Sequence, residues 1–133
     1  MPELTPFEFR GADEALDAES QASSYVARLA RGLTTTDELL MSIATQLEFP
    51  DYFGFNWNAL SDCLRDFHWL QHHTVVLIHQ DLPKISDSDL VEYVEVLADA
   101  VQSWQPGEEH ALRVVFPEQA RKDVLRLLIS RTN

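Results

Sequence analysis

The run Thr74–Ile78, five consecutive β-branched or aliphatic residues, constrains the fold more than any other feature. Such an uninterrupted run is typical of a strand covered on both faces. Strand patterns at residues 25–29 and 112–116 flank it in the sequence, and helical patterns fall between them. Strands separated by helices favour a parallel sheet with right-handed crossovers. The sequence therefore predicts an α/β fold in which a small three-stranded parallel sheet packs against helices.

The helices are predicted from their start signals and from apolar residues at helical spacing. Thr35 followed by Glu38 resembles a capping box at the start of a first helix. Asn56 is predicted to cap a second, short helix. A third, amphipathic helix is expected over residues 86–104, and a final one from about residue 117.

The N-terminal part is less clearly patterned. In Pro6–Arg10 the phenylalanines alternate with polar residues, which is compatible with a short edge strand. The acidic segment 11–24 is compatible with a loop, a frayed helix or a linker. We therefore divide the chain into an N-terminal extension, residues 1–23, and one domain, residues 24–133.

Charge and cysteine content limit the class of partner and the compartment. The chain has 133 residues and a net charge of −12. This charge repels the phosphate backbone of nucleic acids and attracts a basic partner. The single cysteine, Cys63, cannot form an internal disulfide, and no apolar run approaches the ~20 residues of a membrane span. The N-terminus lacks a secretory signal pattern. We expect a cytoplasmic protein that binds neither nucleic acid nor membrane and is a monomer when free.

The sequence gives little support for catalysis or metal binding. His68, His72, His73 and His79 lie close together in the chain, but the adjacent His72 and His73 would point apart in an extended chain, and the four do not match a fixed zinc-ligand spacing. Cys63 lies among apolar and acidic residues, which favours packing over nucleophilic chemistry. We expect no cofactor, no metal and no enzymatic activity.

The second helix and the loop before it offer a candidate recognition surface. On that helix Asn58, Ser61 and Asp62 fall on one side, opposite the apolar positions. Tyr52 and Phe55 lie in the loop before the helix, and Trp57 stands in its first turn. Aromatic residues beside a carboxylate are typical of protein interfaces. The alternative is that the aromatic residues are core and the polar ones are only solvated.

The segment from Leu33 to Leu64 resembles the barstar family without a gap. The resemblance rests on a helix ending near residue 47, then a proline, an acidic residue, Tyr-Phe-Gly, an asparagine, Ala-Leu and Asp-Cys-Leu in fixed register. The strand, acidic helix and strand that follow are also in the family's order, so that the resemblance covers about residues 25–116. It implies a barstar-like fold, with extensions at both ends of the chain.

The resemblance also implies a function. Members of this family bind barnase-type ribonucleases and block the active site, so that this chain would be an inhibitor, immunity protein or antitoxin for a basic ribonuclease or related toxin. Asp62 would be the key acidic residue. The implied partner-binding residues are Tyr52, Gly54, Asn56, Trp57, Asn58, Ser61, Asp62 and, on the third helix, Asp99.

Three positions depart from the family pattern. Asn58 stands where a second aspartate is frequent, Ser61 where a tryptophan can occur, and Phe55 where a charged residue is common. A less acidic and more aromatic surface suits a different ribonuclease, or a partner that is not a nuclease. The alternative hypothesis is therefore a barstar-fold interaction or regulatory module.

Overall fold

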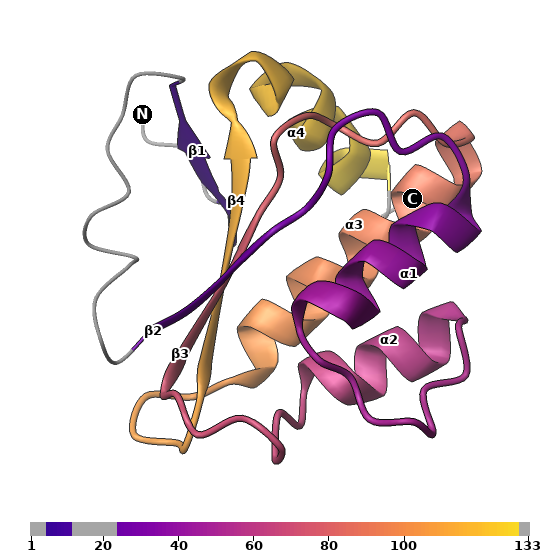
Figure 1. The fold of residues 1–133 in the computed structure, drawn as a ribbon. Helices are drawn as coiled ribbons and strands as arrows, with labels where there is room; N and C mark the ends of the chain where they lie inside the picture. Colours follow the sequence, from indigo (N-terminus) through magenta and orange to yellow (C-terminus); the bar gives the residue numbers. More distant parts are fainter. Residues whose placement is uncertain (1–4, 12–23, 131–133) are drawn as a thin grey trace.

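The computed structural model describes residues 5–11 and 24–130. Within these ranges the chain forms a sheet and a layer of helices (Figure 1). The strands are β1 (Glu8–Arg10), β2 (Ser24–Arg28), β3 (Thr74–Ile78) and β4 (Ala111–Pro117). The helices are α1 (Thr36–Gln46), α2 (Trp57–Leu64), α3 (Asp87–Ser103) and α4 (Arg121–Ser130). A 3₁₀ turn, Glu118–Ala120, leads into α4.

The sheet has the order β1-β4-β3-β2, and each strand is parallel to its neighbours. The predicted α/β class and parallel sheet are confirmed, but the prediction of three strands is wrong, because the described residues form four. The added strand, β1, comes from the segment that the sequence marked as a possible edge strand. Most of the acidic segment 11–24, whose sequence is compatible with a loop, a frayed helix or a linker, falls at residues 12–23 and lies outside the described residues.

Contacts far away in the sequence fix β1 at the edge of the sheet. Phe7 is buried just before it, with its ring edge-on to that of Phe116 at 5.3 Å. Glu8 accepts a hydrogen bond from Arg113 Nε on β4, at 2.7 Å. On the other face, the Arg121 guanidinium lies 4.5 Å from the centre of the Phe9 ring. Because these partners lie about a hundred residues away, the short alternating pattern alone could not reveal the strand.

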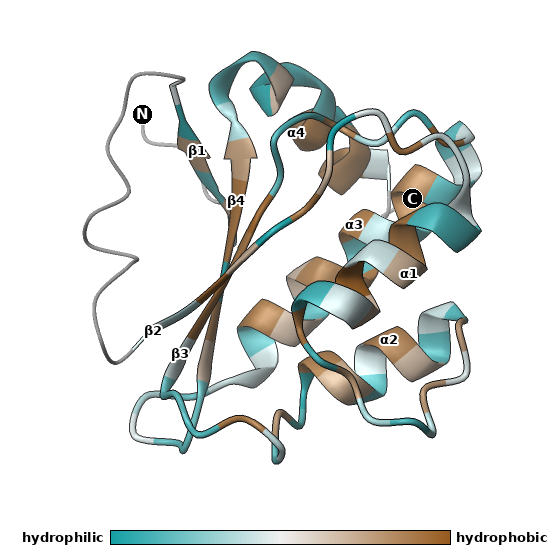
Figure 2. Cartoon of the chain, in the orientation of Figure 1, coloured by the Kyte–Doolittle hydropathy of each residue, from teal (hydrophilic) through white to brown (hydrophobic). Residues whose placement is uncertain are grey.

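All four helices cover the same face of the sheet (Figure 1). Between helices and sheet lies the main core, into which every other strand residue points, as the period of two requires. Figure 2 shows the apolar sides of the helices turned toward this layer. The opposite face of the sheet carries a smaller buried cluster, Val76, Ile78 and Val115, with Val26 beside it. The central strand is thus covered on both faces, as its unbroken apolar run predicted.

The predicted helix starts are confirmed by their caps. Thr35 and Glu38 form a complete capping box on α1, in which the Thr35 hydroxyl accepts from the Glu38 amide at 3.0 Å. Ser86 caps α3 through the Asp89 amide. Each cap satisfies backbone donors that a helix start would otherwise leave unpaired. No helix in the described ranges has the length and apolar character needed to cross a membrane.

Candidate functional site

The candidate site consists of the loop at residues 48–56 and α2, which follows it. A series of aromatic rings in contact joins the loop to the core. The distance between ring centroids is 4.8 Å from Phe55 to Phe53 and 4.9 Å from Phe53 to Phe49. From Phe49 to Trp69 it is 5.7 Å. The Trp69 indole donates to the Leu47 carbonyl at 2.9 Å, at the end of α1. The series begins in the packed interior and ends at the surface, so that the loop is supported from below.

Two aromatic side chains of this loop are exposed. Tyr52 is 67% exposed and Phe55 is 45% exposed, whereas Phe53 between them is buried. Phe55 has a φ of 54°, in the left-handed region that is unfavourable for a bulky residue. An exposed aromatic residue held in a strained backbone is poor for stability and typical of a binding surface. Phe55 is not among the partner-binding residues that the family resemblance implies, although the sequence places it in the loop that borders the polar face of the helix.

Asn56 sets the start of α2, as predicted. Its side-chain oxygen accepts from the Ala59 amide at 2.8 Å, and its side-chain nitrogen donates to the Gly54 carbonyl at 3.3 Å. Both ends of the amide are therefore used to shape the turn. Gly54 is exposed, with room for a side chain at ordinary contact distance, so that close packing does not require a glycine there.

The outward face of α2 carries polar side chains in the predicted arrangement. Asn58, Asp62 and Arg65 are exposed and Ser61 is half-buried. On the other side of the helix, Leu60 and Leu64 are fully buried, as is Phe67 beyond its end. Asp62 is the only carboxylate within α2. The helix thus presents one negative charge between hydrogen-bonding groups, with the exposed aromatic residues at its start.

Trp57 is less available than the other candidate residues. It is half-buried, and its ring lies 6.0 Å from that of the fully buried Tyr93 on α3. A second link between the helices is the hydrogen bond from the Trp104 indole to the Leu64 carbonyl, at 3.0 Å. Trp57 therefore orients α2 on α3 and exposes only part of its ring.

Asp99 is exposed on α3, the helix against which α2 packs. At 3.6 residues per turn, it is rotated by about 130° from the side of α3 that carries Tyr93 and Trp104. Those two residues make the contacts with α2. The structure thus places Asp99 on the solvent side of the neighbouring helix, whereas the other predicted residues form one continuous loop-and-helix surface.

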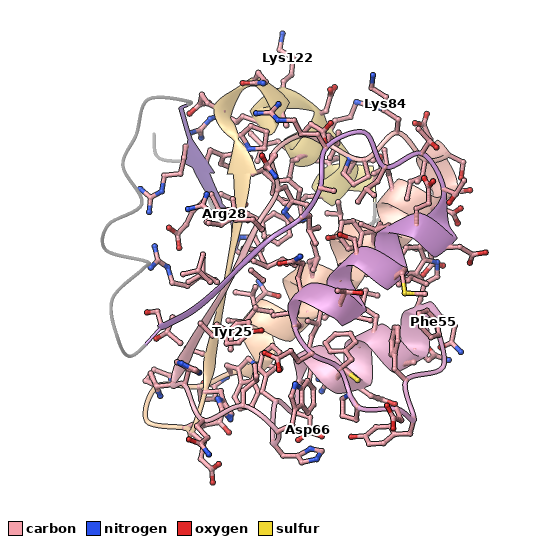
Figure 3. The ribbon with its side chains drawn as sticks, viewed as in Figure 1. Tyr25, Arg28, Phe55, Asp66, Lys84 and Lys122 are labelled. Carbon is pink, nitrogen blue, oxygen red and sulfur yellow. The ribbon has the colours of Figure 1, made fainter. Side chains whose placement is uncertain are left out.

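Cys63 lies under this surface and is buried, as the packing interpretation expects. Burial raises the pKa of its thiol to about 11, and Asp66 and Asp62 add to the effect. The Tyr52 pKa is also raised, by partial desolvation and then by the charge of Asp66 and of Cys63. Figure 3 shows Phe55 near the start of α2 and Asp66 beyond its end.

The histidines do not converge on one point. His68 is paired with Asp66 at 2.8 Å, His73 with the Glu109 carbonyl, and His79 is buried in the core. Among residues 5–11 and 24–130, no group of three or more His, Cys, Asp or Glu side chains could hold a metal ion. The polar groups of α2 are therefore the better candidates for function.

A comparison of the sequence with protein-family models finds a family that matches a segment containing this loop and α2. The family described as barstar, the barnase inhibitor, matches residues 25–117, which is more than two thirds of the chain. This chain belongs to the barstar family. The match runs from β2 through β4, so that it contains the whole loop and α2, whereas β1 and α4 lie outside it. No curated protein and no solved structure matches the chain significantly.

Barstar-family membership confirms the resemblance found in the sequence and fits the fold of the matched region. The family's description names an inhibitor and not an enzyme.

Proposed function

We propose that this protein inhibits a barnase-type ribonuclease by placing the loop at residues 48–56 and α2 in the enzyme's active site. The observation that carries the proposal is the exposed Asp62, which stands alone among polar groups on a rigid helix face. A ribonuclease cleft must be basic in order to hold substrate phosphates. A carboxylate presented on a helix occupies such a cleft as a substrate phosphate would.

The mechanism needs no chemistry in the inhibitor. The net charge of −12 attracts a basic enzyme and accelerates encounter. After docking, Asp62 accepts charge-assisted hydrogen bonds inside the cleft, and Asn58 and Ser61 add neutral ones. Tyr52 and Phe55 cover apolar surface at the rim of the cleft. The bound inhibitor excludes RNA sterically and electrostatically.

Rigidity is what makes this surface suitable. Asn56 fixes the start of α2, and the series of rings from Phe55 to Trp69 supports the loop. A surface that is ordered before binding loses little conformational entropy when the complex forms. We expect the loop and helix to bind without rearrangement.

The alternative is a barstar-fold interaction module whose partner is not a nuclease. The observation that favours it is the composition of the surface: α2 has one carboxylate, an adjacent basic Arg65, and exposed aromatic residues at its start. Such a surface is less suited to a strongly basic cleft than one with two aspartates. The two hypotheses differ in the importance of Asp62.

The test is a cleavage assay with fluorescently labelled RNA and a basic barnase-type ribonuclease encoded beside this protein. The enzyme is titrated with the wild type, with Asp62→Ala and with Asp123→Ala. Asp123 is an exposed acid on α4, so that both variants lose one negative charge, but only one of them changes the α2 surface.

We expect stoichiometric inhibition by the wild type and by Asp123→Ala. Asp62→Ala should dissociate at least about tenfold faster, because a lost charged hydrogen bond acts mainly on the off-rate. Equal inhibition by both variants would show that Asp62 is not the anchor. If the wild type neither inhibits nor binds that enzyme, the interaction module becomes the better hypothesis.

A further inference from the structure

We propose a second binding site, for a small phosphate-type anion, at the carboxyl end of the sheet. The site is a pocket whose walls include Arg10, Arg28 and Arg31, together with Gln80 and Gln119. It is separate from the α2 surface and does not depend on the proposed inhibitor function.

The pocket forms where the parallel strands end. Arg10 is the last residue of β1 and Arg28 the last residue of β2, and Gln80 follows β3 by two positions. In open parallel α/β sheets, ligands bind outside the carboxyl ends of the strands. The topology therefore brings basic and amide side chains from separate strands to the place where this class of fold holds ligands.

Two of the arginines face away from the helices. Arg10 and Arg28 alternate along their strands with Phe9 and Ala27, which belong to the main core. Ile78, the register partner of Arg28, also lines the pocket. The pocket thus opens toward the side of the sheet opposite α2, and a bound anion would leave the α2 surface accessible.

The arginines differ in how they are neutralised. Arg10 pairs with Glu8 at 2.8 Å. Arg28 and Arg31 form no ion pair with any acidic side chain in the part of the chain that the structure describes, although the chain has 22 acidic residues and only 10 basic ones. Two arginines without carboxylate partners beside one pocket provide forked donors that suit a phosphate.

The net negative charge of the protein does not prevent anion binding at this place. At physiological ionic strength, exposed charges are largely screened beyond about 8 Å, so that the nearby charges set the potential. These are the three arginines, Glu8, which is paired with Arg10, and Asp81, which accepts a hydrogen bond from the Gly32 amide. Basic residues gather at this end of the molecule: Lys84 follows β3, and Lys122 follows β4. Figure 3 shows Arg28, Lys84 and Lys122 toward the end of the molecule where the strands terminate, and Phe55 and Asp66 near α2.

The shape of the pocket limits the ligand. Its volume is about 190 Å³, below the range of ~300–1,000 Å³ that drug-sized ligands occupy. The buried His79 at its wall offers no free ring nitrogen, because one contacts the Val115 carbonyl and the other the Tyr93 hydroxyl. Recognition therefore falls to the arginines and the glutamines, which suits inorganic phosphate or a small phosphomonoester.

The experiment is a titration of the full-length, ¹⁵N-labelled protein with sodium phosphate, followed by NMR at constant ionic strength and pH 7. We expect saturable shifts confined to residues around Arg28, Arg31 and Gln80. A second titration with glycerol phosphate distinguishes a site for free phosphate from one for phosphomonoesters. Arg28→Gln/Arg31→Gln should weaken binding at least about tenfold, as expected for lost charged hydrogen bonds.

The matched control is Lys84→Gln/Lys122→Gln, which removes the same charge at the same end of the molecule but leaves the pocket unchanged. This variant should bind phosphate as the wild type does. Shifts that do not saturate, or that spread equally over all basic residues, would refute the site. Equal weakening in both double variants would show a diffuse basic surface instead of a pocket.

Discussion

The buried His79 makes a quantitative prediction about stability at mildly acidic pH. Its ring lies stacked on Phe116 at a centroid distance of 4.1 Å, with Nδ1 3.1 Å from the Val115 carbonyl and Nε2 2.6 Å from the Tyr93 hydroxyl. A carbonyl only accepts, so that Nδ1 carries the proton and Nε2 accepts from Tyr93. The geometry therefore holds a neutral imidazole in the core.

The energetic consequence follows from the pKa. Burial lowers the pKa of His79 from 6.5 to about 4. Between these values the unfolded chain binds the proton and the folded chain does not, so that stability is fully present above pH 6.5 and falls as the pH drops toward 4. From pH 7 to pH 5, this one group should lower the free energy of unfolding by about 2 kcal/mol.

Urea unfolding of the wild type and of His79→Phe at pH 7 and pH 5 measures this contribution. The change in free energy of unfolding between pH 7 and pH 5 is compared in the two proteins. Groups that titrate alike in both contribute equally, so that the difference reports His79. We expect the wild type to lose about 2 kcal/mol more than the variant over this interval. An NMR titration of His79 gives an independent measurement, which holds even if the variant is poorly folded. A pKa of 6 or above would refute the argument.

Three further predictions test the edge strand, a helix cap and the buried thiol. Phe7→Ala should lower the free energy of unfolding by about 3 kcal/mol in urea, because it leaves a cavity beside Phe116; a change below ~1 kcal/mol would mean that the N-terminal segment is not part of the fold. Thr35→Ala should lower the free energy of unfolding in urea by about 1 kcal/mol, because it removes the N-cap of α1. Thr45 is exposed in the last turn of α1, and Thr45→Ala should lower it much less; equal effects would argue against the capping box. Cys63 should react with iodoacetamide at pH 8 on the order of 100-fold more slowly in the folded protein than in urea, and comparable rates would contradict its burial and raised pKa.

Local signals in the sequence are sufficient for most of the matched region. The apolar run of β3 needs no partner to be recognised, since it must be covered on both faces. The capping residues Thr35 and Asn56 act within three positions of their targets, so that their roles are visible in the sequence itself. The helical spacing of Leu60 and Leu64 likewise separates the buried side of α2 from its polar side.

What the sequence does not show depends on distant partners or on backbone conformation. β1 is held in place by the contact of Phe7 with Phe116 and by the hydrogen bond from Arg113 to Glu8. The residues next to Phe7 and Glu8 in the sequence do not indicate these partners. The left-handed φ of Phe55 is equally hidden, because pattern reasoning assigns such conformations to glycine, and the adjacent Gly54 has no positive φ.

The distribution of charge connects the two proposed sites. Strands β1 and β2 end at an arginine, and Lys84 and Arg121 come after β3 and β4, whereas α2 carries its one carboxylate on the surface that faces away from the sheet. The carboxyl end of the sheet is where α/β enzymes hold substrates. In this protein the pocket at the strand ends is lined by arginines and glutamines, and the proposed recognition surface for a protein partner is the separate loop and helix α2.

Changes in α2, such as Asn58→Asp, can alter the choice of partner while the pocket at the strand ends stays unchanged. Asn58→Asp should therefore alter affinity for a basic enzyme and leave the phosphate titration unaltered, which would show that the two surfaces are energetically independent.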